Sequence, residues 1–282
     1  MTVGASPFVF SIDLEDHRPD PSYPKRYPEV TRSLLDFLAE RNIRASVFVL
    51  GRLVREEPGL IREIAERGHE VAYHSAQHVH LTRETPERFV QQSREDIKFI
   101  EDLIGKSLSG YRAPAFSLTP ESAWAIEAIQ ELGFCYSSSV MPVKNPINGY
   151  PGAPRKAFYW PNGLLEIPAP VAELGPLSVP FLGGIYLRYL PTAAITRFIK
   201  RYSSDQEKWI YCHPHDFDHQ ERFFQIEGTS FLVSLLLWFN RRGTMRKLDA
   251  ILPQSVASDM PQTFAEKLAA GHYASAAQYA PA

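Results

Sequence analysis

The sequence has few cysteines, almost no net charge and no leader-like start. Its 282 residues include only Cys135 and Cys212, too few for a disulfide framework, which fits a reducing compartment. The formal net charge is −2, so the composition gives no electrostatic reason to expect a nucleic-acid partner. Met1 to Pro7 carries neither a basic n-region nor an apolar h-region. We therefore expect a cytoplasmic protein.

Long apolar runs are also missing. The longest run is FLVSLLLWF, from Phe231 to Phe239, and nine residues are far too few to cross a bilayer. A short run of this kind is typical of a buried helix, which is our prediction here. Contact of this helix with a partner or with lipid stays open as the alternative.

The sequence does contain alternating strand-like and helix-like segments. Hydrophobic spacing predicts strands at 8–12, 44–51, 70–74, 108–114, 135–140 and 209–213. It predicts helices at 29–42, 58–69, 85–105, 119–134, 231–239 and 243–252. A strand followed by a helix, repeated along the chain, predicts an α/β fold with a parallel sheet and crossover helices.

Two segments depart from this alternation. Residues 141–191 are rich in Pro and Gly, and strand-like pieces such as GGIYLRYL (183–190) are expected to extend one face of the fold, not to form a second domain. Residues 253–282 end in small and polar residues and are expected to form a weakly structured tail.

Polar side chains gather where the predicted strands end. Asp13, His74, Arg112 and Ser137 lie at or just past carboxyl ends of strands, where active sites of parallel α/β sheets and barrels are found. His74 and His78 of HSAQH are four residues apart, and neutral imidazoles at this spacing can bind one divalent cation. Acids after the first strand could add the anionic ligand of an open hydrolytic site. A histidine-rich solvent loop is the alternative.

Two further residues have candidate roles at the same mouth. His213 ends an apolar strand, and a histidine that does not ligate the metal can act as general acid for a leaving amine. Arg112 would hold a neighbouring carboxylate ionised and oriented. The polar residues at 215–219 are predicted to be loop, capping or turn residues, and Cys212 a buried structural thiol.

In their order and spacing, four motifs resemble those of polysaccharide deacetylases of the NodB-homology group, carbohydrate esterase family 4. They are SIDLED (11–16), HSAQH (74–78), RAP (112–114) and YCHP (211–214). Later stretches resemble the branch near peptidoglycan deacetylases and allantoinase-like enzymes of surface-glycan biosynthesis. The resemblance spans residues 6–252 and implies one domain, a distorted (β/α)7-type barrel with Pro/Gly-rich loop insertions. It also implies one divalent metal per subunit, usually Zn²⁺.

The resemblance assigns roles to single residues. Asp13 matches the catalytic base, Arg112 the residue that pairs with it, and His213 the general acid. His74 and His78 match metal ligands. The candidate residues for lining the substrate mouth are Pro114, Met141, Tyr186 and Tyr189, of which Pro114 and Tyr186 are the predicted substrate-binding residues.

The chain departs from the usual motifs at two places. Relatives carry two adjacent aspartates, a base and then a ligand, whereas here Leu14 separates Asp13 from the next acids, Glu15 and Asp16. Strand alternation puts Asp13 and Glu15 on one face, so Glu15 is the first choice of ligand, and Asp16 is the choice if the chain turns after Asp13. Ser137 stands where relatives often carry Asp, which leaves the local hydrogen bonding open.

The resemblance implies a metal-dependent hydrolase that removes an N-acetyl group from an amino sugar in a bacterial surface polysaccharide or its precursor. The expected partner is an N-acetylated glycan, with a lipid-linked substrate, peripheral membrane association and a homo-oligomer left open, and no nucleic acid. The alternatives are an allantoinase-like cyclic amide hydrolase and a non-catalytic glycan-binding barrel.

Overall fold

The computed structural model describes residues 8–143, 149–174, 177–201, 207–226, 228–252 and 263–281. The strands of its main sheet are β1 (Val9–Leu14), β2 (Ala45–Val49), β3 (Glu70–Tyr73), β4 (Gly110–Tyr111), β5 (Tyr136–Ser137), β6 (Phe158–Tyr159), β7 (Leu165–Glu166) and β10 (Trp209–Cys212). A separate antiparallel pair is formed by β8 (Val171–Leu174) and β9 (Leu177–Pro180).

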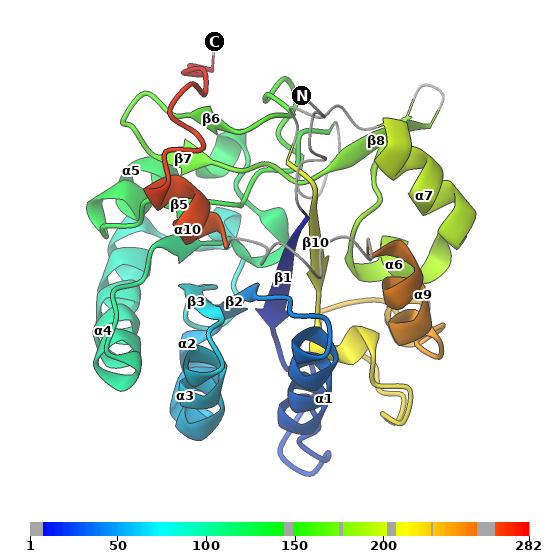
Figure 1. The fold of residues 1–282 in the computed structure, drawn as a ribbon. Helices are drawn as coiled ribbons and strands as arrows, with labels where there is room; N and C mark the ends of the chain where they lie inside the picture. The colour runs from blue at the N-terminus through cyan, green and yellow to red at the C-terminus, as the bar shows by residue number, and fades with distance from the viewer. Residues whose placement is uncertain are drawn as a thin grey trace.

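The main sheet has eight strands in the order β10-β1-β2-β3-β4-β5-β7-β6. Every neighbouring pair is parallel except β6 with β7. The sheet curves along this order, and its first two strands, β10 and β1, lie side by side near the centre of Figure 1. The structure confirms the predicted α/β class, with a mostly parallel sheet that curves into a distorted, open barrel.

The helices are α1 (Tyr27–Ala39), α2 (Gly51–Glu56), α3 (Pro58–Glu66), α4 (Pro86–Ile104), α5 (Trp124–Glu131), α6 (Gly184–Tyr189), α7 (Thr192–Arg201), α8 (Phe231–Trp238), α9 (Thr244–Ile251) and α10 (Phe264–Ala269). The start and end of α4 follow from its sequence. Thr85 caps the first turn by accepting a hydrogen bond from the Arg88 amide, and Gly105 ends the helix with a φ of 69°. In Figure 1, α1, α2 with α3, and α4 stand side by side along the sheet.

The two faces of β1 belong to different parts of the interior. Phe10, Ile12 and Leu14 pack in the hydrophobic cluster that the sheet shares with α1 and α3. The odd-numbered residues of β1 face the inside of the curved sheet, where Val9 packs in a second cluster with Trp209. Asp13 is therefore carried to the inner face, at the carboxyl end of the strand.

Two sequence-based expectations about the Pro/Gly-rich middle and the tail are corrected by the structure. Within GGIYLRYL, Gly184–Tyr189 is helix α6 and not a strand-like piece. Gly183 before it makes an isolated parallel bridge with Tyr211 and lies so close that a Cβ would be 2.2 Å from the Tyr211 ring. The tail expected to be weakly structured contains α10, and Phe264 of α10 is fully buried in the inner cluster. Residues 253–262 lie outside the described residues.

The apolar run at 231–239 is a helix, as predicted, but the prediction that it is buried is wrong. Ser234 is the buried residue of α8, whereas Phe231, Leu232 and Leu236 are exposed. Periodicity could not show this, because a helix that is apolar on all sides gives no preferred face. Within the described part of the chain, no helix has the length and apolar character needed to cross a membrane.

Candidate active site

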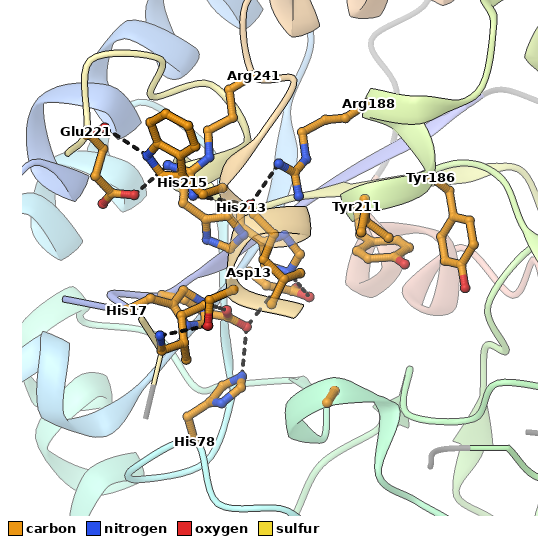
Figure 2. Close-up of a pocket in the computed structure, with 18 of the residues that line it drawn as sticks. Asp13, His17, His78, Tyr186, Arg188, Tyr211, His213, His215, Glu221 and Arg241 are labelled. Atoms are coloured by element: carbon orange, nitrogen blue, oxygen red, sulfur yellow. Dashed lines mark hydrogen bonds and ion pairs between the residues drawn. The ribbon is translucent and has the colours of Figure 1, made fainter. Parts of the chain in front are cut away.

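The carboxyl ends of β1, β3, β4 and β10 meet around one cavity of about 420 Å³. Asp13, Glu15, His78 and His213 all line this cavity. Figure 2 shows Asp13, His78 and His213 turned toward one another from different segments of the chain. The structure therefore brings together the predicted base, acid and metal ligands, which lie up to 200 residues apart in the sequence.

A buried ion pair holds Asp13. Arg112 Nη1 donates to Asp13 Oδ1 at 2.5 Å and to Ser11 Oγ at 2.9 Å, and both charged side chains are almost fully buried. The guanidinium carbon lies 3.9 Å from the centre of the Phe48 ring and 4.5 Å from that of Trp209. These contacts fix Arg112 in place, and Arg112 in turn orients the carboxylate of Asp13 and offsets its charge.

Glu15 forms a compact set with the two histidines of HSAQH. Its Oε1 lies 3.1 Å from His74 Nε2 and 2.9 Å from His78 Nε2. His74 Nδ1 is 2.8 Å from the carbonyl oxygen of Arg112, which can only accept, so Nδ1–H donates there and Nε2 is the nitrogen turned toward Glu15. Ligand atoms of the three residues all lie within 4.8 Å of one another. Two imidazoles and one carboxylate are the donor set of an open divalent-metal site.

The loop that carries these histidines is held in an uncommon backbone conformation. Ser75 and His78 have φ angles of 70° and 59°, in the left-handed region that side chains other than glycine rarely adopt. HSAQH is thus a tight loop and not a helical turn. The left-handed residues reverse the chain direction so that His78 points back to Glu15.

The structure separates the two acids between which the sequence left a choice. Glu15 is 5% exposed and lies on the same side of the chain as Asp13. Burial opposes its ionisation, but the positive charges of His78 and His213 and the hydrogen bonds from His17 and His74 hold the pKa of Glu15 well below its usual range. Asp16 instead accepts hydrogen bonds from Arg18, one from Nε at 2.6 Å. Asp16 belongs to none of the candidate metal groups among the described residues.

His213 is backed by a buried carboxylate that itself has a buried partner. Its Nδ1 lies 2.8 Å from Asp216 Oδ2, and Asp216 Oδ1 is 2.9 Å from Arg188 Nε. Burial disfavours the imidazolium, but Glu15, Asp216 and Asp13 outweigh that effect and raise the pKa of His213 to about 9. His213 Nε2 faces the cavity, 3.9 Å from Asp13 Oδ2.

Sequence reasoning predicted a turn or capping role for Asp216 and no role for Arg188. The capping role is present, because Asp216 accepts the backbone N–H of His213 at 2.9 Å in the short 3-10 helix Pro214–Asp216. Its contact with His213 could have been inferred from the three-residue spacing. The pairing with Arg188 could not, since Arg188 lies 28 residues away in the sequence and no local spacing connects the two.

His17 and His215 extend the histidine cluster beside Glu15. His17 Nε2 lies 2.6 Å from Glu15 Oε2, and the His17 and His215 rings meet edge to face at 4.6 Å between centres. Glu15, His17 and His215 form a second candidate cation group. Because this group shares Glu15 with His74 and His78, it belongs to the same site. Sequence analysis included His215 among residues with a loop, capping or turn role.

Of the two predicted substrate-binding residues, Tyr186 and Pro114, only Tyr186 lines the cavity. Tyr186 lines the cavity, and so does Met141, whereas Pro114 is buried beside it and the two residues after it form the wall. Those residues, Ala115 and Phe116, have φ angles of 52° and 53°. Tyr189, the other aromatic residue considered for the mouth, donates its hydroxyl to the Leu236 carbonyl at 2.9 Å.

Ser137, at the position where an aspartate was expected, supports the RAP loop through a second serine. Its Oγ donates to Ser139 Oγ at 2.8 Å, and Ser139 Oγ accepts the Ala113 amide at 2.9 Å. All of these groups are buried. The local hydrogen bonding that the missing aspartate left open is therefore provided by hydroxyl groups.

This fold and this site define a hydrolase class: a parallel α/β barrel whose mouth holds an Arg-paired aspartate, a His–His–carboxylate set and a carboxylate-backed histidine. The family model described as "Polysaccharide deacetylase" matches residues 20–136. The match confirms, for this part of the chain, the resemblance to polysaccharide deacetylases of the NodB-homology group, carbohydrate esterase family 4, that the motifs indicated. A second model, described as a domain of unknown function (DUF3473), matches residues 138–265.

Part of the chain is similar to curated proteins named as deacetylases of glycans. The peptidoglycan-N-acetylglucosamine deacetylase PgdA of Listeria monocytogenes is 35% identical over 85 residues, which are 30% of this chain and 18% of that protein. A chitooligosaccharide deacetylase of Rhizobium leguminosarum bv. trifolii is 41% identical over 73 residues, 25% of this chain and 34% of that protein. The chain thus matches a fifth to a third of the length of these curated relatives.

A solved structure shows that the fold extends over the whole chain. It is that of a Mycobacterium smegmatis protein described as a polysaccharide deacetylase, and it superposes with a TM-score of 0.62 at 17% identity. The superposition covers 99% of this chain and 95% of that one. The distorted barrel predicted from the sequence is therefore confirmed.

Proposed function

We propose that this protein is a metal-dependent deacetylase that removes the N-acetyl group from an amino sugar of a surface polysaccharide or its precursor. The observation that carries the proposal is the convergence of Glu15, His74 and His78 beside Asp13, with His213 across the cavity. The family and the relatives named as deacetylases of N-acetylglucosamine glycans support the substrate class. A cytoplasmic location remains a prediction from the sequence.

The chemistry of the donor set fits a divalent metal ion. Glu15 Oε1, His74 Nε2 and His78 Nε2 would hold it, and the Arg112 carbonyl fixes the tautomer of His74 that ligation requires. When bound there, a divalent cation, with Zn²⁺ the expected ion, would acidify a water molecule and polarise the acetamide carbonyl.

Asp13 is placed to take the proton from the attacking water. One of its oxygens is held by Arg112, and the other faces the cavity toward His213. Because Arg112 also bonds to Ser11 and to the Ser138 carbonyl, the carboxylate cannot rotate away from the cavity without breaking the buried pair. Such fixed placement is what general base catalysis requires.

His213 is placed to give a proton to the departing amine. Its pKa of about 9 keeps the imidazole protonated at neutral pH, and Asp216 keeps Nδ1–H engaged so that Nε2–H points into the cavity. The C–N bond breaks as the amine nitrogen takes this proton. Acetate and a free amino sugar are the products.

The test is release of acetate from N-acetylglucosamine oligosaccharides, with and without a chelator. We expect Asp13→Asn to lower kcat at least about 100-fold, the usual effect of removing a general base. The matched control is Asp102→Asn, which also turns a carboxylate into an amide but lies on the exposed face of α4, paired with Lys98. Full activity of Asp13→Asn, or full activity after chelation, would refute the proposal. Activity confined to cyclic amides would favour the allantoinase-like alternative.

A further inference from the structure

Helix α8 presents an exposed apolar surface at the rim of the active-site cavity. Five of its residues and the one that follows have large apolar side chains that are exposed to solvent. The exposed fractions are 55% for Phe231, 74% for Leu232, 44% for Val233, 37% for Leu235, 47% for Leu236 and 58% for Phe239. Monomeric proteins rarely expose so many large apolar residues together without a binding function.

The inner side of the same helix forms part of the cavity wall. Ser234, Leu237 and Trp238 line the cavity, next to Tyr186 and Phe224. One face of α8 is therefore turned to the reaction site and the other outward. Whatever covers the outer face lies one helix diameter from the cavity, or about 10 Å.

Polar contacts hold α8 in this position. Ser230 caps its first turn, and Ser234 Oγ accepts the Ile226 amide at 3.0 Å. At the other end, Arg188 Nη1 donates to the carbonyls of Leu237 and Phe239, both at 2.8 Å. The helix is thus held in place through its ends and its inner side. Its outer face is exposed although the helix is well ordered, and not because the helix unfolds locally.

The charge close to α8 is mostly positive. Arg222 precedes the helix, Arg242 and Arg246 follow it, and all three are exposed. The neighbouring Phe223 ring packs against Phe231 and Trp238 at 5.5 and 5.7 Å between centres, which keeps Arg222 beside the helix. From 222 to 248 the sequence has five basic residues and one acidic residue, Glu227.

We propose that α8 and its flanking arginines form a surface that docks on an anionic phospholipid bilayer, with the cavity opening at the lipid–water interface. Apolar side chains on a surface helix enter the boundary of the acyl chains while neighbouring basic side chains bind headgroups. A second copy of the chain fits this surface less well. A two-fold interface on α8 would bring each arginine rim against its equivalent, like charge against like charge.

The bilayer would also define the form in which substrate arrives. An amino sugar carried on a lipid would be presented at the same depth as the cavity, which is the substrate class that the position of α8 favours. This second step rests on the proposed deacetylase activity. The docking itself does not, and it is tested without any enzymatic measurement.

The experiment is co-sedimentation of the full chain with vesicles of phosphatidylcholine alone or with phosphatidylglycerol at about 3:1. The variant is Leu232→Asp with Leu236→Asp, which changes only outward-facing positions one helical turn apart. The matched control is Phe99→Asp, an exposed apolar residue on α4. We expect wild type and control to bind the anionic vesicles, and the double variant to bind at least about 10-fold more weakly.

A further variant tests the charge, with Arg222, Arg242 and Arg246 all changed to Gln. We expect it to lose the preference for phosphatidylglycerol, and added salt to weaken the wild type. Equal binding by every variant, or no binding by wild type, would overturn the proposal. So would a wild-type dimer in light scattering that the double aspartate variant dissociates while neither protein binds vesicles.

The outcome is separable from that of the proposed function. The double aspartate variant should hydrolyse soluble oligosaccharides at the wild-type rate, because neither leucine lines the cavity. Vesicle binding by a protein that releases no acetate would count against the deacetylase proposal alone.

Discussion

The buried pair of Arg112 and Asp13 yields the sharpest prediction about stability. Arg112 has no exposure to solvent and Asp13 has 2%. Arg112→Met keeps an unbranched stem between Phe48 and Trp209 but leaves the Asp13 carboxylate without its positive partner. Breaking one side of a buried ion pair costs about 3–5 kcal/mol, so we expect the free energy of unfolding to fall by that amount.

Urea denaturation followed by circular dichroism measures this loss. The matched control is Lys98→Met, which breaks an ion pair with Asp102 that is exposed on both sides and should cost no more than about 0.5 kcal/mol. Much of the expected loss comes from the uncompensated carboxylate, not from the missing contacts. Arg112→Met combined with Asp13→Asn should therefore be more stable than Arg112→Met alone.

The reasoning would be refuted if Arg112→Met cost as little as Lys98→Met. It would also be refuted if the double variant were less stable than Arg112→Met by the full cost of Asp13→Asn alone. That additive result would mean that the two side chains do not interact, contrary to the 2.5 Å contact between them.

Three further predictions concern the charges in and near the site. Glu15→Ala should abolish Zn²⁺ binding in calorimetry, whereas Asp16→Ala should keep it, because only Glu15 lies with the paired histidines. The imidazolium of His213 is the active form, so activity should fall as pH rises through about 9, and Asp216→Asn should move that fall to lower pH by removing a carboxylate that raises the pKa of His213. Burial raises the pKa of Glu70 to about 7, so wild-type stability should decrease between about pH 4.5 and 7, by at most about 3 kcal/mol, and Glu70→Gln should remove this decrease.

The sign of the Glu70 effect follows from proton uptake. The folded protein keeps a proton on this carboxyl that the unfolded chain releases above about pH 4.5. Rising pH therefore stabilises the unfolded state relative to the folded state. Ser46 and Tyr136 donate hydrogen bonds to different oxygens of Glu70. Glutamine keeps one acceptor oxygen, and its NH2 group can donate to the other hydroxyl. An unchanged pH slope in Glu70→Gln would contradict the assignment. Loss of Zn²⁺ from Asp16→Ala, or an alkaline limb unmoved by Asp216→Asn, would contradict the other two predictions.

Much of the site could be predicted because parallel strands deliver their carboxyl ends to one edge. Asp13 lies near the end of its strand, and His74, Arg112 and His213 each directly follow one, so pairing of those strands brings the four together. The first choice of Glu15 over Asp16 rested on alternation along the strand. The structure agrees with that choice of face, since β1 runs through Leu14 without a turn.

The remaining features depend on tertiary contacts that have no local pattern. Asp216 and Arg188 are 28 residues apart in different loops and helices, and nothing near either residue in the sequence marks the pair. The prediction that α8 is buried was wrong because most helices that are apolar on all sides are buried, and this one is not. Its actual position is set by side chains of other segments, above all Arg188, which binds its last carbonyls.

Arg188 consequently joins two parts of the molecule that seem unrelated in the sequence. Its guanidinium contacts Asp216, which backs His213, and the same group binds the carbonyl end of α8. If the outer helix shifts, Arg188 loses partners in a place that water does not reach, and the charge balance behind the proton donor changes with it. The surface helix and the proton donor are thus mechanically linked, and substitutions that reposition α8 must also alter the environment of His213.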